Sequence, residues 1–278
     1  MRSARWIIDA TPWLLLAALL LPQAGCTSIL QQAYDRHTVY RDTGDEVALR
    51  DAVVLYQEHT AGCPEVDSCQ EALRLLGDAL LALGRYEEAG AAYRNAVHVD
   101  RGTEAAAAAA RGNIRALEGW MNIPPEGLGM TRWSAGPPLL ETEMPPRPGD
   151  APQPMSAIEE LLIEAADLFL SLEEAYEERT AMRYQVAFLL YQRRHYDAAA
   201  TRWREMAEAD PASAEAVSAM KILLPTHHLR QDWAALQRDG RFFAELQGLS
   251  LTPEEHQNLL DRVEEARLRE AGEWEEAP

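Results

Sequence analysis

Positive charge is scarce in this sequence. The chain has 26 lysine and arginine residues against 45 aspartate and glutamate residues, a formal net charge of −19, and Lys221 is the only lysine. No basic stripe runs along the chain, so we expect neither nucleic acid nor an anionic lipid surface as a charge-matched partner. The acidic excess is typical of a solvated outer face; the alternative is that it steers a basic partner to the protein.

Signals of catalysis and of cofactor binding are missing as well. No strand pattern is present, so no glycine-rich phosphate loop follows a strand, and no cysteine and histidine residues have metal-site spacing. His227 and His228 are adjacent, and we expect both on the surface, in a loop after Pro225. We therefore predict a non-enzymatic protein with no cofactor, no metal and no small-molecule substrate. The remote alternative, a cell-wall-acting enzyme, would need a catalytic acid in a cleft, and none is recognised.

Cysteine is rare, with three residues in the chain. Cys63 and Cys69 have too many residues between them for a Cys-x-x-Cys redox site. In an oxidising compartment a pair this close is a candidate disulfide. The alternative is two reduced, inert thiols.

No apolar run is long enough to cross a membrane. The longest, from Trp13 to Leu21, is much shorter than the ~20 residues that a spanning helix needs. It follows Arg2 and Arg5 and precedes small residues, which is the pattern of a secretory signal peptide over residues 1–25.

The end of this segment, Ala24-Gly25-Cys26, resembles the lipobox of bacterial lipoproteins, in which the cysteine is acylated and becomes the mature N-terminus. Gln23 departs from the pattern, because a leucine is usual at that position. The resemblance implies lipidation of Cys26 and, with Thr27 next, anchoring to the outer membrane on its periplasmic side. The alternative is ordinary signal cleavage, in which Cys26 is not lipidated.

What the sequence does contain is a repeated pattern of large and small helical residues. In its clearest copy, small residues stand where two helices must approach closely and large ones fill the space between the helices. The large residues are Leu73, Leu76, Leu80 and Tyr93, and the small ones are Gly77, Ala89 and Ala96. The pattern resembles the tetratricopeptide repeat (TPR) family, whose helix–turn–helix units stack into a solenoid and bind other proteins.

Two further copies keep the same register. Ala52 is followed by Tyr56 and Pro64, and Ala199 by Trp203 and Pro211. In the copy around Ala199, the first helix has Arg183 where a large apolar residue is usual. We therefore predict an all-α solenoid of TPR-like repeats; the rival interpretation is an irregular helical bundle.

Proline density divides the helical pattern into two predicted lobes. Proline excludes helix between residues 121 and 155, so this segment is a predicted linker. The predicted order is a signal peptide (1–25), a tether (26–42), an N-terminal lobe (43–120), the linker (121–155), a C-terminal lobe with a capping helix (156–270) and an acidic tail (271–278). Within the linker, Trp133, Leu139 and Leu140 either pack on the protein itself or dock a partner.

Candidate partner-binding residues lie on the first helix of each clear repeat, because the TPR resemblance implies a groove lined by those helices. Tyr184, Phe188 and Tyr191 form one aromatic stripe, which either grips a peptide or packs on the helix predicted over residues 158–179. The equivalent polar stripe is formed by Glu71, Arg74, Asp78 and Leu81.

The sequence thus predicts a lipid-anchored scaffold or adaptor that docks another envelope protein in its concave groove. The machine would be one of motility, secretion or barrel assembly. The alternative within the same class is a pilot or assembly chaperone that escorts one envelope client.

Overall fold

The computed structural model describes residues 28–63, 66–121, 146–175 and 177–274. Within these ranges the chain forms eleven helices and no strand. The chain divides into two compact units, Met1–Gly62 and Cys63–Pro278. The residues Cys26, Trp133, Leu139 and Leu140, for which we make predictions above, lie outside the described residues. No helix in the described ranges combines the length and the apolar character needed to cross a membrane.

The described part of the first unit is a pair of helices, α1 (Ile29–Thr43) and α2 (Glu46–Ala61). Ser28 and Asp45 cap their N-termini by accepting backbone N–H groups. Tyr56 of α2 is fully buried, and its hydroxyl lies 3.3 Å from His37 Nδ1 of α1. Helix α1 thus occupies most of the segment predicted as a tether, because it packs along α2.

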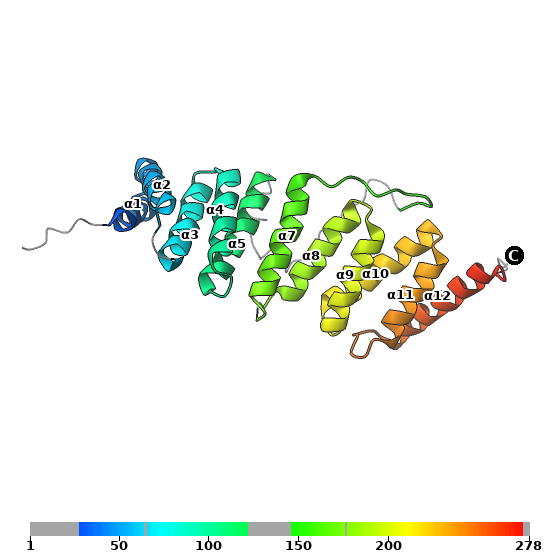
Figure 1. Ribbon diagram of the computed structural model, residues 1–278. Coiled ribbons are helices and arrows are strands. Elements are labelled where there is room, and N and C mark those ends of the chain that lie inside the picture. The colour runs from blue at the N-terminus through cyan, green and yellow to red at the C-terminus, as the bar shows by residue number, and fades with distance from the viewer. Residues whose placement is uncertain (1–27, 64–65, 122–145, 176, 275–278) are drawn as a thin grey trace, which may run out of the picture. The chain divides into compact units, whose positions relative to one another are not determined.

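The second unit contains the other nine described helices, which follow one another along the stack in Figure 1. They are α3 (Val66–Ala82), α4 (Tyr86–Val99), α5 (Glu104–Trp120), α7 (Ala157–Leu172), α8 (Arg179–Gln192), α9 (Tyr196–Ala209), α10 (Ala214–Arg230), α11 (Trp233–Glu245) and α12 (Pro253–Ala271). Helices pack in successive pairs, so the predicted all-α class with TPR-like helical repeats is confirmed.

Helices α3, α4 and α5 meet around one tyrosine. A Cβ added at Gly77 of α3 would lie 2.6 Å from the Tyr93 ring, and one at Gly112 of α5 would also collide with it. The ring is therefore confined between two glycines, and its hydroxyl donates to Asp78 Oδ1 at 2.7 Å. The small residue predicted at position 77 is what allows this close packing.

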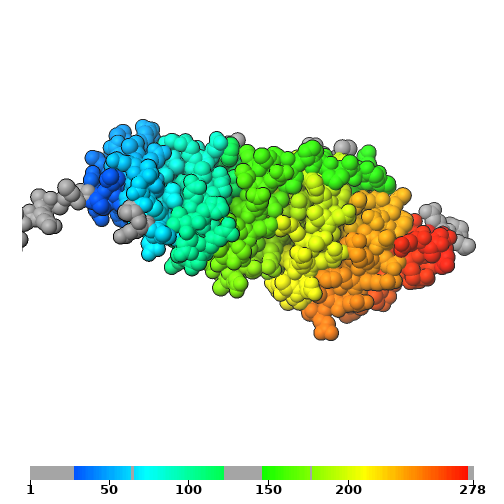
Figure 2. Space-filling view, viewed as in Figure 1, coloured from blue at the N-terminus to red at the C-terminus, as the bar shows by residue number. Residues whose placement is uncertain are grey.

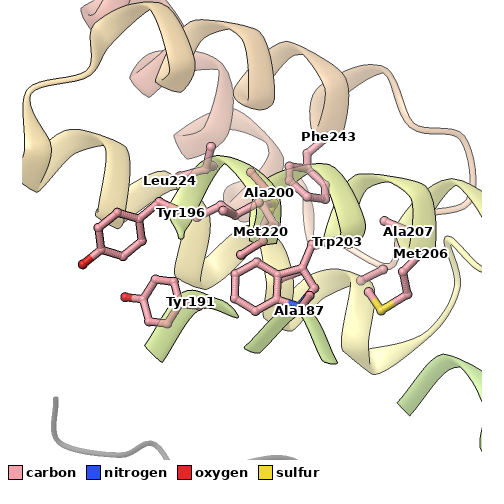
Figure 3. Close-up of a cluster of buried hydrophobic side chains, with 14 of the residues drawn as sticks. Ala187, Tyr191, Tyr196, Ala200, Trp203, Met206, Ala207, Met220, Leu224 and Phe243 are labelled. Atoms are coloured by element: carbon pink, nitrogen blue, oxygen red, sulfur yellow. The ribbon is translucent and has the colours of Figure 1, made fainter. Parts of the chain in front are cut away.

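Helices α8 and α9 meet around Trp203, which is fully buried. Its ring lies among Ala187, Tyr191 and Met220 in Figure 3, and its indole N–H donates to the Tyr184 carbonyl at 3.2 Å. The cluster continues into the next helices through Leu223, Leu236 and Phe243. With Leu259 and Ala266 of α12, this core extends from α8 to α12.

The division at the proline-rich segment is not where the structure separates the chain. Helix α5 packs directly against α7, although residues 121–156 lie between them in sequence. Figure 2 shows these two green helices as parts of one continuous surface. The predicted lobes 43–120 and 156–270 therefore share one stack from α3 onward, while α2 belongs to the other unit. Proline ends a helix, but it does not prevent the flanking helices from packing together.

Two helix ends also differ from the sequence prediction. The helix predicted over residues 158–179 stops at Leu172, where the Arg179 side chain donates to the Leu170 and Glu173 carbonyls. Helix α10 was expected to end before Pro225 but continues to Arg230. Its last turns contain Thr226 and His227, both buried, so tertiary contacts outweigh the hydrogen bond lost at proline.

Candidate functional site

The aromatic stripe of α8 is part of the hydrophobic core. Tyr184, Phe188 and Tyr191 are 3%, 7% and 9% exposed. Their rings lie 5.5, 6.4 and 5.7 Å from the Trp203 ring, centroid to centroid. Burial raises the pKa of Tyr184 to about 12. The structure therefore favours the packing alternative, although the stripe packs on α9 where we had expected the preceding helix.

The polar stripe of α3 forms a closed ion-pair cluster. Arg74 contacts Glu71 at 2.6 Å and Asp78 at 2.7 Å, and Asp78 also accepts the hydroxyl of Tyr93. The hydrogen bond that Arg74 donates to Glu71 is the main cause that raises the pKa of Arg74 above its usual range. Leu81 is half-buried one turn further along the helix. The charged side chains of this stripe already pair with one another, so a partner would have to compete with these internal ion pairs.

Cys63 and Cys69 form a disulfide, with their Cα atoms 5.5 Å apart. It ties the chain before α3 to the first turns of that helix. The pair therefore has a structural position, remote from the residues that line the pocket described below.

A buried charge network that the sequence analysis missed joins α9, α10 and α11. His227 and Asp239 are both fully buried, and His227 Nε2 donates to Asp239 Oδ2 at 2.8 Å. Arg204 and Arg238 lie 2.5 and 2.9 Å from the other carboxylate oxygen. Burial alone would raise the pKa of Asp239, but hydrogen bonds from His227 and Arg238 and the charge of Arg204 lower it far below its usual range.

His227 is therefore not the surface histidine that we predicted, whereas His228 is exposed and contacts Trp233 edge-on. An aspartate–histidine pair resembles half of a catalytic triad. No substrate can reach this pair, because both side chains are inaccessible to solvent. We conclude that the network holds three helices together. Among the described residues no group of histidine, cysteine, aspartate and glutamate has the arrangement of a metal site.

The candidate site is an open pocket of about 510 Å³ where α7, α8 and α9 meet. Such a volume lies within the range of ligand-binding clefts. It is lined by Asp167, Leu170 and Ser171 of α7, Arg179 and Arg183 of α8, and Arg202, Glu205, Met206 and Ala209 of α9. We call it the arginine pocket.

The arginines of this pocket have different partners. Arg202 forms a bidentate ion pair with Asp167, in which its two terminal nitrogens donate to the two carboxylate oxygens at 2.8 and 2.7 Å. Arg179 donates to carbonyl oxygens at the end of α7. Arg183 is half-buried, and the described residues offer it no hydrogen bond and no ion pair. Desolvation and the neighbouring charge of Arg179 lower the pKa of Arg183 below its usual range.

Arg183 stands on a different face of α8 from the aromatic stripe. At 3.6 residues per turn, Arg179 and Arg183 are rotated by roughly 140° from the direction of Tyr184 and Phe188. The predicted groove residues and the arginine pocket therefore do not come together. A signal for the pocket was present in the sequence, since Arg183 replaces the large apolar residue expected there.

No protein-family model matches the chain, and no curated protein matches it. Among solved structures, one similar chain is described as putative kinesin light chain nearly identical TPR-like repeats from Podospora anserina, with 11% identity and a TM-score of 0.39. The match covers 87% of this chain and 97% of that one. Another is BtubC (BKLC) from P. vanneervenii, with 12% identity, a TM-score of 0.32, and coverage of 89% and 85%.

Stacked helical pairs of the kind that this chain forms typically serve as protein-binding scaffolds.

Proposed function

We propose that this protein is a non-enzymatic scaffold that docks a partner protein over the arginine pocket of α7, α8 and α9. The observation that supports this proposal is Arg183, a half-buried cation for which the described residues provide no hydrogen bond and no ion pair. Burying such a group is costly in the free protein, and a partner that supplies an anionic hydrogen-bond acceptor offsets this cost.

The proposed location is the periplasmic side of the outer membrane of a Gram-negative bacterium, with Cys26 lipidated. The basic start, the short apolar run and Cys26 support export, and a disulfide between Cys63 and Cys69 is compatible with an oxidising compartment. Replacing Cys26 by alanine should move the protein from the membrane fraction to the soluble periplasmic fraction. An unchanged membrane association would overturn the lipid anchor.

The proposed role is that of an adaptor within a multiprotein envelope machine for motility, secretion or barrel assembly. A pilot or assembly chaperone for one envelope client is the alternative. The adaptor role predicts a partner that stays bound, whereas a pilot releases its client after delivery. Pulse-chase crosslinking separates the two, because an adaptor's adduct persists and a pilot's adduct declines as the client matures.

Site-specific photo-crosslinking in living cells tests the docking surface. The photoreactive residue replaces Ser171, which is exposed and lines the pocket. The matched control is Leu260 of α12, an exposed residue outside the pocket. We expect one dominant protein adduct from position 171 and none from position 260. The proposal is wrong if both positions give the same adducts or neither gives any while the protein remains folded.

A further inference from the structure

The walls of the arginine pocket combine positive charge with apolar surface. Arg179, Arg183 and Arg202 face two acids, Asp167 and Glu205, so the pocket carries an excess of positive charge in a chain of net charge −19. The remaining lining includes Leu170, Met206 and Ala209. A ligand that matches this lining carries an anionic group beside an apolar one.

The availability of the arginines decides which of them meets the ligand. Asp167 already neutralises Arg202, and Arg179 uses one terminal nitrogen on two carbonyl oxygens. An arginine has five N–H donors, so Arg179 keeps donors to spare. Within the part of the chain that the structure describes, Arg183 has no hydrogen bond and no ion pair that a ligand would have to break. Arg183 is therefore the principal contact and Arg179 the second.

The charge of the whole chain narrows the chemistry of the ligand. A polyanion such as nucleic acid or an anionic bilayer would bring many negative charges close to an acidic protein, and their repulsion would oppose one local attraction. A single carboxylate on a polypeptide brings only one negative charge, so the repulsion is much smaller. Its two oxygens also match the planar fork of a guanidinium group.

We infer that the arginine pocket binds a carboxylate of the partner polypeptide, with an adjacent apolar side chain against Leu170 and Met206. The carboxylate belongs to a glutamate or aspartate side chain or to a chain end, since both present the same group. This inference rests on the proposed scaffold function and specifies how the partner is recognised.

Peptide titration of the full-length protein tests the inference. The probes are acetyl-Ala-Leu-Glu-Ala-amide, with a side-chain carboxylate, acetyl-Ala-Gln-Leu with a free C-terminus, and acetyl-Ala-Leu-Gln-Ala-amide, with neither. Binding is followed by the NMR signals of the arginine Nε–H groups. We expect at least one carboxylate peptide to bind about tenfold or more tightly than the uncharged peptide. The stronger of the two identifies the source of the carboxylate.

Arg183→Gln should abolish this preference, whereas Arg50→Gln, which removes an exposed arginine of α2, should leave it intact. Equal binding of all three peptides, or an unchanged preference in Arg183→Gln, overturns the inference. Inorganic phosphate is a further probe, and its binding at Arg183 without any carboxylate preference also overturns it. A dominant adduct from position 171 together with equal peptide binding would refute carboxylate recognition alone and leave the scaffold function standing.

Discussion

Two helical pairs of the second unit, α3/α4 and α8/α9, have the same local design. Helix α4 begins at Tyr86 and ends at Val99, and α9 begins at Tyr196 and ends at Ala209, at a constant separation. The turn before each has a residue with positive φ, 70° at Gly84 and 61° at Arg194. Arginine rarely adopts this conformation, so both pairs keep the same turn geometry even where the residue disfavours it.

The two pairs differ in the side chains at corresponding positions. Gly77 and Tyr93 of the first pair correspond to Ala187 and Trp203 of the second, and Leu73 corresponds to Arg183. In the first pair Arg74 is paired with two carboxylates, while in the second pair Arg183 lies at a pocket and has no ion pair among the described residues. The comparison indicates that the candidate site arises where one repeat departs from the packing of the other.

Removing the largest core side chain should break the second pair. Trp203→Ala leaves a cavity among three aromatic rings and should lower the free energy of unfolding by about 3–5 kcal/mol. Tyr93→Ala should have a smaller effect, because a smaller side chain is removed. Chemical denaturation measures both. Trp274→Ala, at a site 37% exposed, is the control and should change stability by less than about 1 kcal/mol. A similar loss in this control would contradict the assignment of Trp203 to the core.

A second substitution makes the two pairs alike in polar contacts. Arg94 of α4 lies 3.5 Å from the neutral Asn113, whereas the corresponding Arg204 of α9 lies against Asp239. Asp239→Asn should cost about 3 kcal/mol, since Arg204, Arg238 and His227 lose their shared carboxylate.

The same variant tests the pH dependence of stability. The pKa of Asp239 is lower in the folded state than its ordinary value of about 4, so its contribution is complete above pH ~4 and is lost as the pH falls further. Thermal unfolding between pH 3 and 7 should show a shallower acid-side loss in Asp239→Asn than in the wild type. Parallel pH profiles for the two proteins would rule out the charge network as the cause.

Adding one methyl group to the first pair tests the close approach. Gly77→Ala gains helix propensity, but the new Cβ would lie 2.6 Å from a ring that Gly112 confines from the other side. We expect a net loss of about 1–2 kcal/mol in a denaturant titration. Gly62→Ala is the matched control, because no atom lies within 4 Å of its added Cβ, and it should be nearly neutral.

The substitution with the smallest expected effect on stability gives the second pair the leucine that the first pair has at the corresponding position. Arg183→Leu replaces an unpaired, half-buried cation by an apolar side chain and should raise stability by about 0.5–1 kcal/mol. The same variant should lose the adduct formed from position 171. Thermal unfolding and crosslinking, measured on one preparation, check both effects. Lower stability with the adduct retained would mean that Arg183 serves the fold.

The sequence predicted those parts of the fold that depend on neighbouring residues. The capping box of Ser156 and Glu159 and that of Thr252 and Glu255, for example, each join residues three apart in sequence. The contact of His227 with Asp239 joins different helices, and neither residue carries a local signal of burial. The arginine pocket likewise exists only after three helices assemble. Its one local signal in the sequence is Arg183, which stands where the repeat pattern has a large apolar residue.

The pairing of α5 with α7 across residues 121–156 also has a kinetic consequence. The other neighbouring helices of the stack are joined by short connections, so their contacts form between residues close in sequence. Closing the longer connection costs about 2 kcal/mol more in chain entropy than closing one of a few residues. Because contacts distant in sequence slow folding, the docking of α7 onto α5 is the expected late step in assembling the second unit. The two halves of the stack would then acquire their helices first and their common core last.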